Sequence, residues 1–250
     1  MNLVGDLLAR DRRTRDPALV TPDGRGRTHH DLITNGYKAA NVLRYLGVRA
    51  GATVAVEPTA GFHTTLAFLG AAAVGAPVRF DPAAGIGAGD RVVLAPVATA
   101  DALDPAPGTN LAAFGGPPDR PDTTHWEKEL WSENPGMPPS DVAPGDPVVR
   151  GADGDVSHRD LCSLAAAAVE TADIGDETRV VLRAPFSDPS ALAAGLVAPP
   201  SAGGRAGRAA TGDGEAKRAA PRGDVAVAPA PATVRAPRRL APASIAPTVE

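Results

Sequence analysis

The sequence predicts an α/β fold in which layers of parallel β-sheet are flanked by helices. Short apolar runs rich in valine alternate with longer segments in which apolar residues recur every three or four positions. The order of elements seen near the N-terminus also returns after residue 147. At 250 residues the chain is long enough for one large domain or two small ones.

The first elements are short. Asn2 can cap a helix that ends near Arg10, and residues 18–21 form a strand-like run closed by the turn formers at 22–24. Thr28 and Asp31 then have the spacing of a capping box, and the helix that they begin ends at Gly47. Five apolar or small residues lie on one face of this helix: Leu32, Gly36, Ala39, Leu43 and Leu46.

Three further strands complete a first αβ subdomain, which we place at residues 1–99. Residues 53–56, 77–80 and 91–95 are short apolar runs, and a helix whose face carries Leu66, Leu69 and Ala73 separates the first two. Strands that alternate with helices predict a parallel sheet.

Residues 100–146 differ from the preceding segment in amino-acid composition. Ten prolines occur between Pro105 and Pro147, and only residues 111–114 and 126–131 offer groups that can pack. We expect a connector that lies over the domain surface, with Trp126 and Trp131 anchoring it rather than stacking on a ligand.

The first pattern returns at residues 147–200. Ser157 and Asp160 repeat the capping spacing, an apolar helix follows, and residues 179–182 form a strand. The pair Asp31-Leu32 corresponds to Asp160-Leu161 at an offset of 129 residues. We interpret this as an internal duplication of an αβ unit, of which the second copy is incomplete.

The last 50 residues, 201–250, have yet another composition. They contain 15 Ala, 6 Pro and 6 Gly, no aromatic residue, and 8 basic against 4 acidic side chains. Such a segment offers little apolar surface to offset its conformational entropy, so we expect a disordered and dispensable tail. The abrupt change after Pro199 also suggests a frameshift in the gene.

Composition excludes several classes of protein. The net charge of -4 gives no electrostatic footprint for nucleic acid, and a single cysteine, Cys162, excludes a disulfide scaffold. The longest apolar stretch, residues 66–78, is shorter than the roughly 20 residues that cross a bilayer. The N-terminus lacks a signal-peptide pattern, so we expect a cytoplasmic protein without a membrane or nucleic-acid partner.

Several short sequence patterns between residues 16 and 82 occur in the same order as in the N-terminal part of another family. They resemble the adenylate-forming, AMP-binding family of acyl-CoA synthetases and ligases. The runs "RDPALVTPDGRGRTHHDL" and "AANVLRYLGVRAGATVAVEPTAGFHTTLAFLGAAAVGAPVRFDP" carry the likeness, and "HWEKEL", "APGDPVV" and "SHRDL" extend it to about residue 200. The resemblance implies a large domain built of two related αβ subdomains, of which this chain would hold the first and part of the second.

This sequence departs from the family pattern at the motifs that carry the family's chemistry. Between Val149 and Ser157 the family has a Ser/Thr/Gly-rich phosphate loop that ends in Pro-Lys-Gly, whereas this chain has a short segment with Asp153 and Asp155 and no lysine. A histidine that often follows an aromatic is absent from residues 185–190. The nucleotide and hinge motifs and the small C-terminal domain would lie beyond residue 200, where nothing resembles them.

Other candidate sites favour structural interpretations. Ser157, His158 and Asp160 are neighbours at a helix start, so capping is favoured over a hydrolase triad. His29 and His30 are adjacent and cannot share a helix face as metal ligands, so we expect both to be exposed to solvent.

A cysteine and a glycine-containing segment also favour structural interpretations. Cys162 lies on an apolar helix face without a local base, which indicates a buried inert thiol. Residues 85–90 contain glycines in a dinucleotide-like spacing but precede a strand, so we expect a loop between strands.

The sequence therefore predicts no catalytic, cofactor-binding or metal-ligating residue. The leading hypothesis is a truncated, catalytically inert relative of acyl-CoA synthetases, an accessory protein or the product of a decaying gene. One alternative is a ligase-like chain that binds a carboxylic acid or nucleotide and completes its site with a partner chain, in which case ATP, Mg²⁺ and CoA would be its cofactors. Another is a protein-interaction module that uses an exposed sheet edge.

Overall fold

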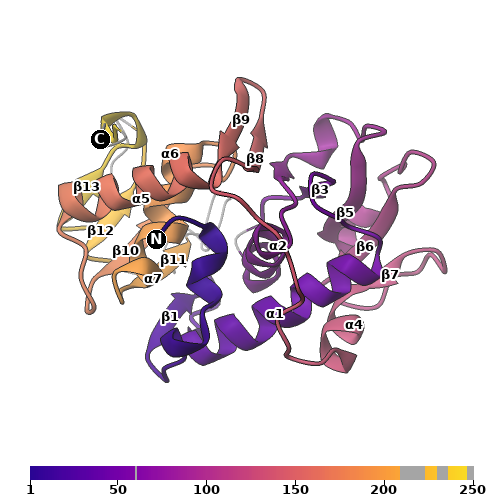
Figure 1. The fold of residues 1–250 in the computed structure, drawn as a ribbon, viewed down its shortest axis with the longest axis horizontal. Helices are drawn as coiled ribbons and strands as arrows, with labels where there is room; N and C mark the ends of the chain where they lie inside the picture. The colour runs from indigo at the N-terminus through magenta and orange to yellow at the C-terminus, as the bar shows by residue number, and fades with distance from the viewer. Residues whose placement is uncertain (60, 209–222, 230–235, 247–250) are drawn as a thin grey trace. The chain divides into compact units, whose positions relative to one another are not determined.

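The computed structural model describes residues 1–250 apart from 60, 209–222, 230–235 and 247–250 (Figure 1). The chain divides into two compact units, each containing one mainly parallel sheet. The first unit comprises Met1–Ile33, Ala60–Phe62 and His158–Glu250, and the second comprises Thr34–Thr59 and His63–Ser157.

Within the described residues, the second unit has a seven-stranded sheet in the order β7-β6-β5-β3-β4-β8-β9. All neighbours are parallel except β8 and β9, which form an antiparallel hairpin. The strands are β3 (Thr53–Val56), β4 (Val78–Phe80), β5 (Asp90–Pro96), β6 (Asn110–Phe114), β7 (Thr124–His125), β8 (Pro147–Gly151) and β9 (Gly154–Ser157). The helical segments are α2 (Phe62–Ala73), η3 (Pro82–Ala84), α3 (Val97–Ala100) and α4 (Trp126–Ser132).

The described part of the first unit has a six-stranded sheet in the order β13-β12-β10-β11-β1-β2, parallel except for the β1–β2 hairpin. The strands are β1 (Pro17–Val20), β2 (Gly26–Thr28), β10 (Arg179–Leu182), β11 (Arg205–Arg208), β12 (Val225–Val227) and β13 (Arg238–Leu240). The helical segments are η1 (Val4–Leu8), η2 (Arg10–Arg12), α5 (His158–Ala172), α6 (Pro189–Leu192), η4 (Ala193–Val197), α7 (Ala198–Ser201) and η5 (Pro242–Ser244).

The two sheets share one strand order. In each of the two repeats along the chain, an antiparallel hairpin leads into a long helix, which is followed by a central strand. These elements are β1–β2, α1 (His29–Tyr45) and β3 in the first repeat, and β8–β9, α5 and β10 in the second. The helices α1 and α5 begin 129 residues apart, the predicted offset. Each hairpin joins the sheet that holds the other repeat's central strand, since β1 pairs with β11 and β8 pairs with β4.

The capping box predicted for the first long helix is present. The Asp31 amide donates to Thr28 Oγ1, and the Thr28 amide donates to Asp31 Oδ2, each at 3.0 Å. These bonds satisfy two backbone donors at the start of α1, where no preceding helical turn can accept them. The short side chains of α1 and α2 also allow close packing, because a Cβ at Gly70 would lie 2.8 Å from the Ala40 backbone nitrogen.

The expected connector at residues 100–146 is wrong in part. Strand β6 lies inside the sheet of the second unit between β5 and β7, and its residues Leu111 to Phe114 are buried. The physical reason is that this short run of apolar residues can pair on both sides, whatever the proline content around it. The segment therefore contributes two strands and α4 to the second unit rather than only covering it.

The expectation of a disordered tail is wrong for the described residues after 200. Strand β11 lies between β10 and β1, β12 pairs with the other edge of β10, and β13 pairs with β12. Ala206, Ala226 and Leu240 are buried although the segment has no aromatic residue. Small aliphatic side chains suffice here because the neighbouring strands and helices supply the rest of the packing.

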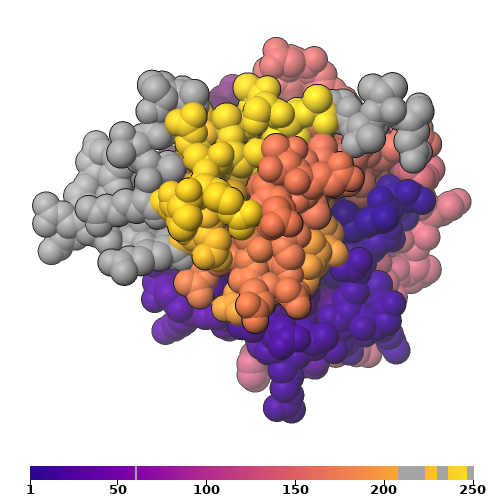
Figure 2. Space-filling model, turned by 90° about the vertical axis from the view of Figure 1, so that its left-hand side faces the viewer, coloured from indigo at the N-terminus to yellow at the C-terminus, as the bar shows by residue number. Residues whose placement is uncertain are grey.

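Figure 2 shows the described tail residues, in yellow, lying directly against the orange part of the first unit. The second αβ copy is thus not limited to residues 147–200. It repeats every strand of the first copy except a counterpart to β7, as far as the described residues extend. The rest of the predicted tail, at 209–222, 230–235 and 247–250, lies outside the described residues.

The start of the chain is also placed differently from the predicted subdomain at 1–99. Residues 1–33 belong to the unit that contains α5 and β10, because β1 pairs with β11. No helix in the described ranges combines the length and apolar character that a membrane span requires.

Candidate functional site

The strand order of the second unit indicates where a ligand site is expected. From β3 the chain passes to β4 on one side, while β5 lies on the other side of β3. In open α/β sheets, ligands bind in the crevice outside the carboxyl ends of the strands at such a reversal. The residues that follow β3 and β5 are therefore the first to consider.

Polar side chains gather at this carboxyl end. Glu57 directly follows β3, and its Oε2 accepts a 2.6 Å hydrogen bond from Thr99 Oγ1, which belongs to the short helix after β5. The backbone of Glu57 is fixed by its amide, which donates to the Leu94 carbonyl at 2.9 Å. Thr59 and Thr64 share a 2.8 Å hydrogen bond beside it. The strand ends thus hold one carboxylate and three hydroxyls in fixed positions.

A second cluster lies at the carboxyl ends of β6 and β7. Glu127 Oε1 accepts from the Gly115 amide at 2.5 Å and lies 3.6 Å from His63 Nε2, while Glu127 Oε2 lies 3.4 Å from His125 Nε2. The His63 ring also packs on Phe114, with 5.4 Å between centroids. All three polar side chains are about two-thirds buried or more.

This arrangement can orient imidazole rings. A carboxylate that contacts a ring nitrogen of a histidine fixes the orientation of the ring. Among the described residues, no group of three or more His, Cys, Asp or Glu side chains is placed to hold a metal ion. Neither this cluster nor the Glu57–Thr99 pair was identified from the sequence, because their members come from separate segments that only the sheet brings together.

The segment that replaces the family's phosphate loop is a tight hairpin. Gly151 pairs with Gly154, so only Ala152 and Asp153 form the turn between β8 and β9. Asp155 forms an ion pair with Arg150, whose Nε lies 3.3 Å from Asp155 Oδ1. Arg150 Nη1 also donates to Thr53 Oγ1 at 2.6 Å. The backbone groups of this segment are thus used in strand pairing, and its one cation is engaged.

The corresponding strand end in the first unit, after β10, serves local structure. Asp188 caps α6, since its Oδ1 accepts from the amides of Ser190 and Ala191 at 2.9 and 3.1 Å. Phe186 is buried. The residues at 185–190 therefore begin a helix, as a Pro at the first helical position and an Asp N-cap favour.

Of the three neighbouring residues Ser157, His158 and Asp160, His158 has a clear structural role. His158 is fully buried at the start of α5, and its Nδ1 accepts a 3.2 Å hydrogen bond from the Val4 amide. The ring therefore ties η1 to α5. Asp160, in the first turn of α5, is exposed, and Ser157 is the last residue of β9.

The adjacent histidines differ in their surroundings. His30 is exposed as expected, but His29 is only 7% exposed, so the expectation of solvent exposure is wrong for His29. The first residue of α1 points inward because the preceding hairpin, β1–β2, is part of the sheet. Burial lowers the pKa of His29, the nearby Asp16 carboxylate opposes this shift, and Arg12 lowers the pKa further.

Cys162 matches its prediction. It is buried on α5, and burial, with a contribution from Asp6, raises the pKa of its thiol to about 11. The glycine-containing segment at 85–90 is a loop before β5, as predicted. Its last residue, Asp90, is 5% exposed and pairs with Arg79, with 2.7 Å between Asp90 Oδ2 and Arg79 Nη2.

The two tryptophans do not share one role. Trp126 is fully buried at the start of α4 and anchors this segment, as predicted. Trp131 is 87% exposed, so its predicted anchoring role is wrong. The helical periodicity explains this, because residues five positions apart point to different faces of α4.

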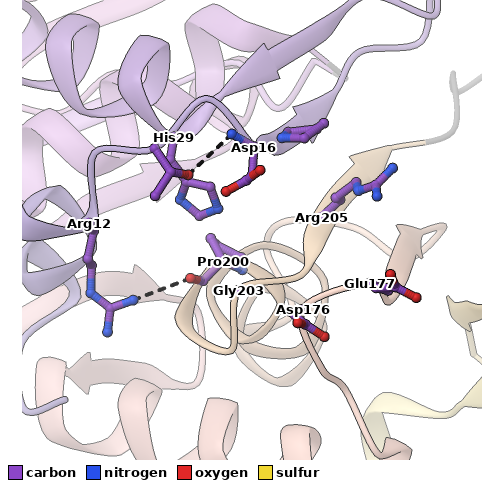
Figure 3. A pocket seen from close by; sticks show the side chains of 10 residues that line it. Arg12, Asp16, His29, Asp176, Glu177, Pro200, Gly203 and Arg205 are labelled. Carbon is purple, nitrogen blue, oxygen red and sulfur yellow. Dashed lines mark hydrogen bonds between the residues drawn. The ribbon is translucent and has the colours of Figure 1, made fainter.

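A cavity of about 450 Å³ lies in the first unit, at the amino ends of β1, β10 and β11 (Figure 3). Its charged lining residues are Arg12, Asp16, His29, Asp176, Glu177 and Arg205. They come from four separate segments of the sequence, and none was proposed as a site residue from the sequence. The parallel pairing of β1, β10 and β11 brings these segments together.

No protein-family profile and no curated protein matches the sequence. Many solved structures do match in fold. The N-terminal domain of FACL13 from Mycobacterium tuberculosis is 20% identical with a TM-score of 0.71, and the match covers 85% of this chain and 58% of that one. The anthranilate CoA ligase AuaEII, in complex with anthranoyl-AMP, is 17% identical with a TM-score of 0.69, covering 82% and 44%.

The nonribosomal peptide synthetase FmoA3 in its AMPPNP-bound form is 22% identical with a TM-score of 0.68, and the match covers 82% of this chain and 22% of that one. The chain thus spans little more than half, or less, of each of these three solved chains. It has the α/β fold of the N-terminal domain of adenylate-forming acyl-CoA synthetases and peptide-synthetase adenylation domains, with two mainly parallel sheets flanked by helices.

Proposed function

We propose that this chain is a relative of the AMP-dependent acyl-CoA synthetases that does not form acyl-adenylates by itself and acts as a cytoplasmic accessory protein. The fold and the sequence cues between residues 16 and 82 support the relationship. The β8–β9 hairpin carries the functional part of the proposal, because it occupies the place in the sequence where that family has its phosphate loop.

Adenylation requires the pyrophosphate leaving group to be held by oriented donors and a cation while a carboxylate attacks the α-phosphorus. In this hairpin Gly151 and Gly154 face each other across the turn, and Arg150 is engaged by Asp155 and Thr53. Asp153 and Asp155 add negative charge where a triphosphate would need positive charge. Two carboxylates alone are also a weak magnesium site. These residues do not fit the phosphates of ATP.

Removal of one preorganised donor typically lowers turnover by about 10²- to 10³-fold. Replacement of a whole phosphate-binding loop by a paired hairpin removes several donors together. Although such losses are not additive, their combined effect brings the expected rate close to background.

The test is carboxylate-dependent exchange of labelled pyrophosphate into ATP by the purified full chain, with acetate, a medium-chain acid and an aromatic acid. We expect no exchange above a control without protein. A second preparation carrying Glu57→Gln serves as the matched control for a contaminating host synthetase, because contamination gives the same rate in both preparations.

Exchange that requires a carboxylic acid and disappears in the Glu57→Gln chain would overturn the proposal. It would favour the alternative that the carboxyl end of β3, with Glu57 and Thr99, forms part of a working adenylation site.

A further inference from the structure

The cavity at the amino ends of β1, β10 and β11 has an unusual distribution of charge. It lies entirely within the first unit and is lined by three carboxylates, two guanidinium groups and one imidazole. Figure 3 shows Asp16 and His29 on one wall, with Asp176 and Glu177 on the other. Its volume of about 450 Å³ lies within the range of roughly 300 to 1,000 Å³ that is typical of small-molecule sites.

Among the described residues, the charged groups of this cavity form no ion pair with one another. Across the described residues, no ion pair or hydrogen bond engages the carboxylates of Asp16, Asp176 and Glu177. The side chain of Arg205 likewise has no partner in the described ranges. Arg12 donates only to the carbonyls of Pro200 and Ser201, at 3.4 Å each. Charges of both signs are therefore available to a bound molecule.

His29 adds a buried polar group to the wall of the cavity. The residue is more than nine-tenths buried. Figure 3 shows its ring between Asp16 and Pro200, on the cavity side of α1. An imidazole can both donate and accept hydrogen bonds, so the ring offers a bound molecule a polar contact.

The mixture of charges restricts the ligand. A polyanion such as a nucleoside triphosphate would be repelled by the three carboxylates, and a simple amine would leave Arg12 and Arg205 without an anionic partner. A molecule with one group of each sign can contact both kinds of charge. We propose that this cavity binds a small zwitterion, whose anionic group contacts Arg205 and whose ammonium group contacts the Asp176–Glu177 wall.

This site is separate from the one considered above for adenylate chemistry. Pro17, Arg179 and Arg205 are the first residues of β1, β10 and β11, whereas substrate sites of open α/β sheets lie at the carboxyl ends. The inference therefore stands or fails independently of the proposed function.

The experiment titrates the full chain with three zwitterions of increasing length, glycine, 4-aminobutyrate and 6-aminohexanoate, by calorimetry and by thermal unfolding. Butyrate and butylamine are the matched probes with one charge. We expect at least one zwitterion to bind saturably in the millimolar range or below, at least about tenfold more tightly than either single-charge probe, since loss of a charge-assisted contact costs about that much.

Three variants locate the site. Arg205→Gln and Glu177→Gln are each expected to weaken zwitterion binding about tenfold, whereas Arg205→Lys, which keeps the charge, is expected to weaken it less. Arg25→Gln is the matched control, because Arg25 is an exposed arginine of the same unit outside the cavity. A circular dichroism spectrum confirms that each variant is folded.

The proposal is overturned if no zwitterion binds saturably, or if butyrate or butylamine binds as tightly as the best zwitterion. It is also overturned if Arg205→Gln and Arg25→Gln have equal effects on binding.

Discussion

The imidazole of His158 and the backbone amide of Val4 are joined by a 3.2 Å hydrogen bond between residues 154 positions apart in the chain. His158 begins α5, and Val4 begins the first 3-10 turn. Because His158 is fully buried, this bond anchors the N-terminus of the chain to the helix that leads to β10. A residue that the sequence offers as part of a triad is thus a structural histidine.

Replacement His158→Ala should lower the free energy of unfolding by about 2 to 4 kcal/mol, because it leaves a cavity and a buried amide without its acceptor. Urea unfolding monitored by circular dichroism measures this loss. His30→Ala is the matched control, since His30 is exposed and its loss should cost less than about 0.5 kcal/mol. Equal effects of the two substitutions would contradict the structural role of His158.

The stability of the chain should depend on pH through His29. Burial lowers the pKa of His29 below its ordinary value of 6.5, so at mildly acidic pH the unfolded chain binds a proton that the folded chain does not. The free energy of unfolding should therefore fall as the pH drops below about 6.5, by up to about 1.4 kcal/mol per pH unit from this group. The contribution is fully present above that pH.

His29→Gln tests this assignment, because it removes the titrating group while keeping a polar side chain. Its free energy of unfolding, measured from pH 5 to 8, should depend less steeply on pH than that of the unmodified chain. Parallel pH profiles for the two proteins would show that His29 does not carry the effect.

Cys162 should react very slowly in the folded protein. With its pKa raised to about 11, only about one thiol in a thousand is ionised at pH 8, against roughly a quarter for an ordinary cysteine. Alkylation by iodoacetamide followed by mass spectrometry should show labelling at least about a hundredfold slower than for glutathione, and rapid labelling in denaturant. Labelling of the folded chain at the glutathione rate would contradict the buried position.

The strands after residue 200 should be required for stability. Ala226 is fully buried in β12, next to β10, so Ala226→Asp should cost about 3 to 5 kcal/mol by burying an unpaired charge. Ala243→Asp, at an exposed position of η5, should change the stability by less than about 0.5 kcal/mol. Thermal unfolding compares the two variants, and equal melting temperatures would restore the interpretation of a dispensable tail.

The elements that could be predicted from the sequence are those with strong local signals. The capping box at Thr28 and Asp31, the helix face that follows it and the 129-residue repeat all depend on residues close together in the chain or on direct similarity. The strands β11 and β12 could not be predicted in this way. They are only three or four residues long, and their small side chains become a buried strand only when β10 lies beside them.

The same limit applies to the sites. The contact between His63 and Glu127 joins residues 64 positions apart, at the ends of elements whose adjacency depends on the order of strands in the sheet. The sequence shows only that His29 is adjacent to His30 and cannot share a helix face with it, whereas the burial of His29 follows from the position of the β1–β2 hairpin. The short β8–β9 turn, in contrast, was visible in the sequence as a segment with two aspartates and no lysine.

The most direct test of the claim that a paired hairpin has replaced a phosphate-binding loop is calorimetric titration of the full chain with ATP in the presence of Mg²⁺. The hairpin predicts no saturable heat through the millimolar range, because Gly151 and Gly154 are paired and Arg150 is engaged by Asp155. Saturable binding of one ATP per chain with a micromolar Kd, weakened by Arg150→Gln, would contradict it.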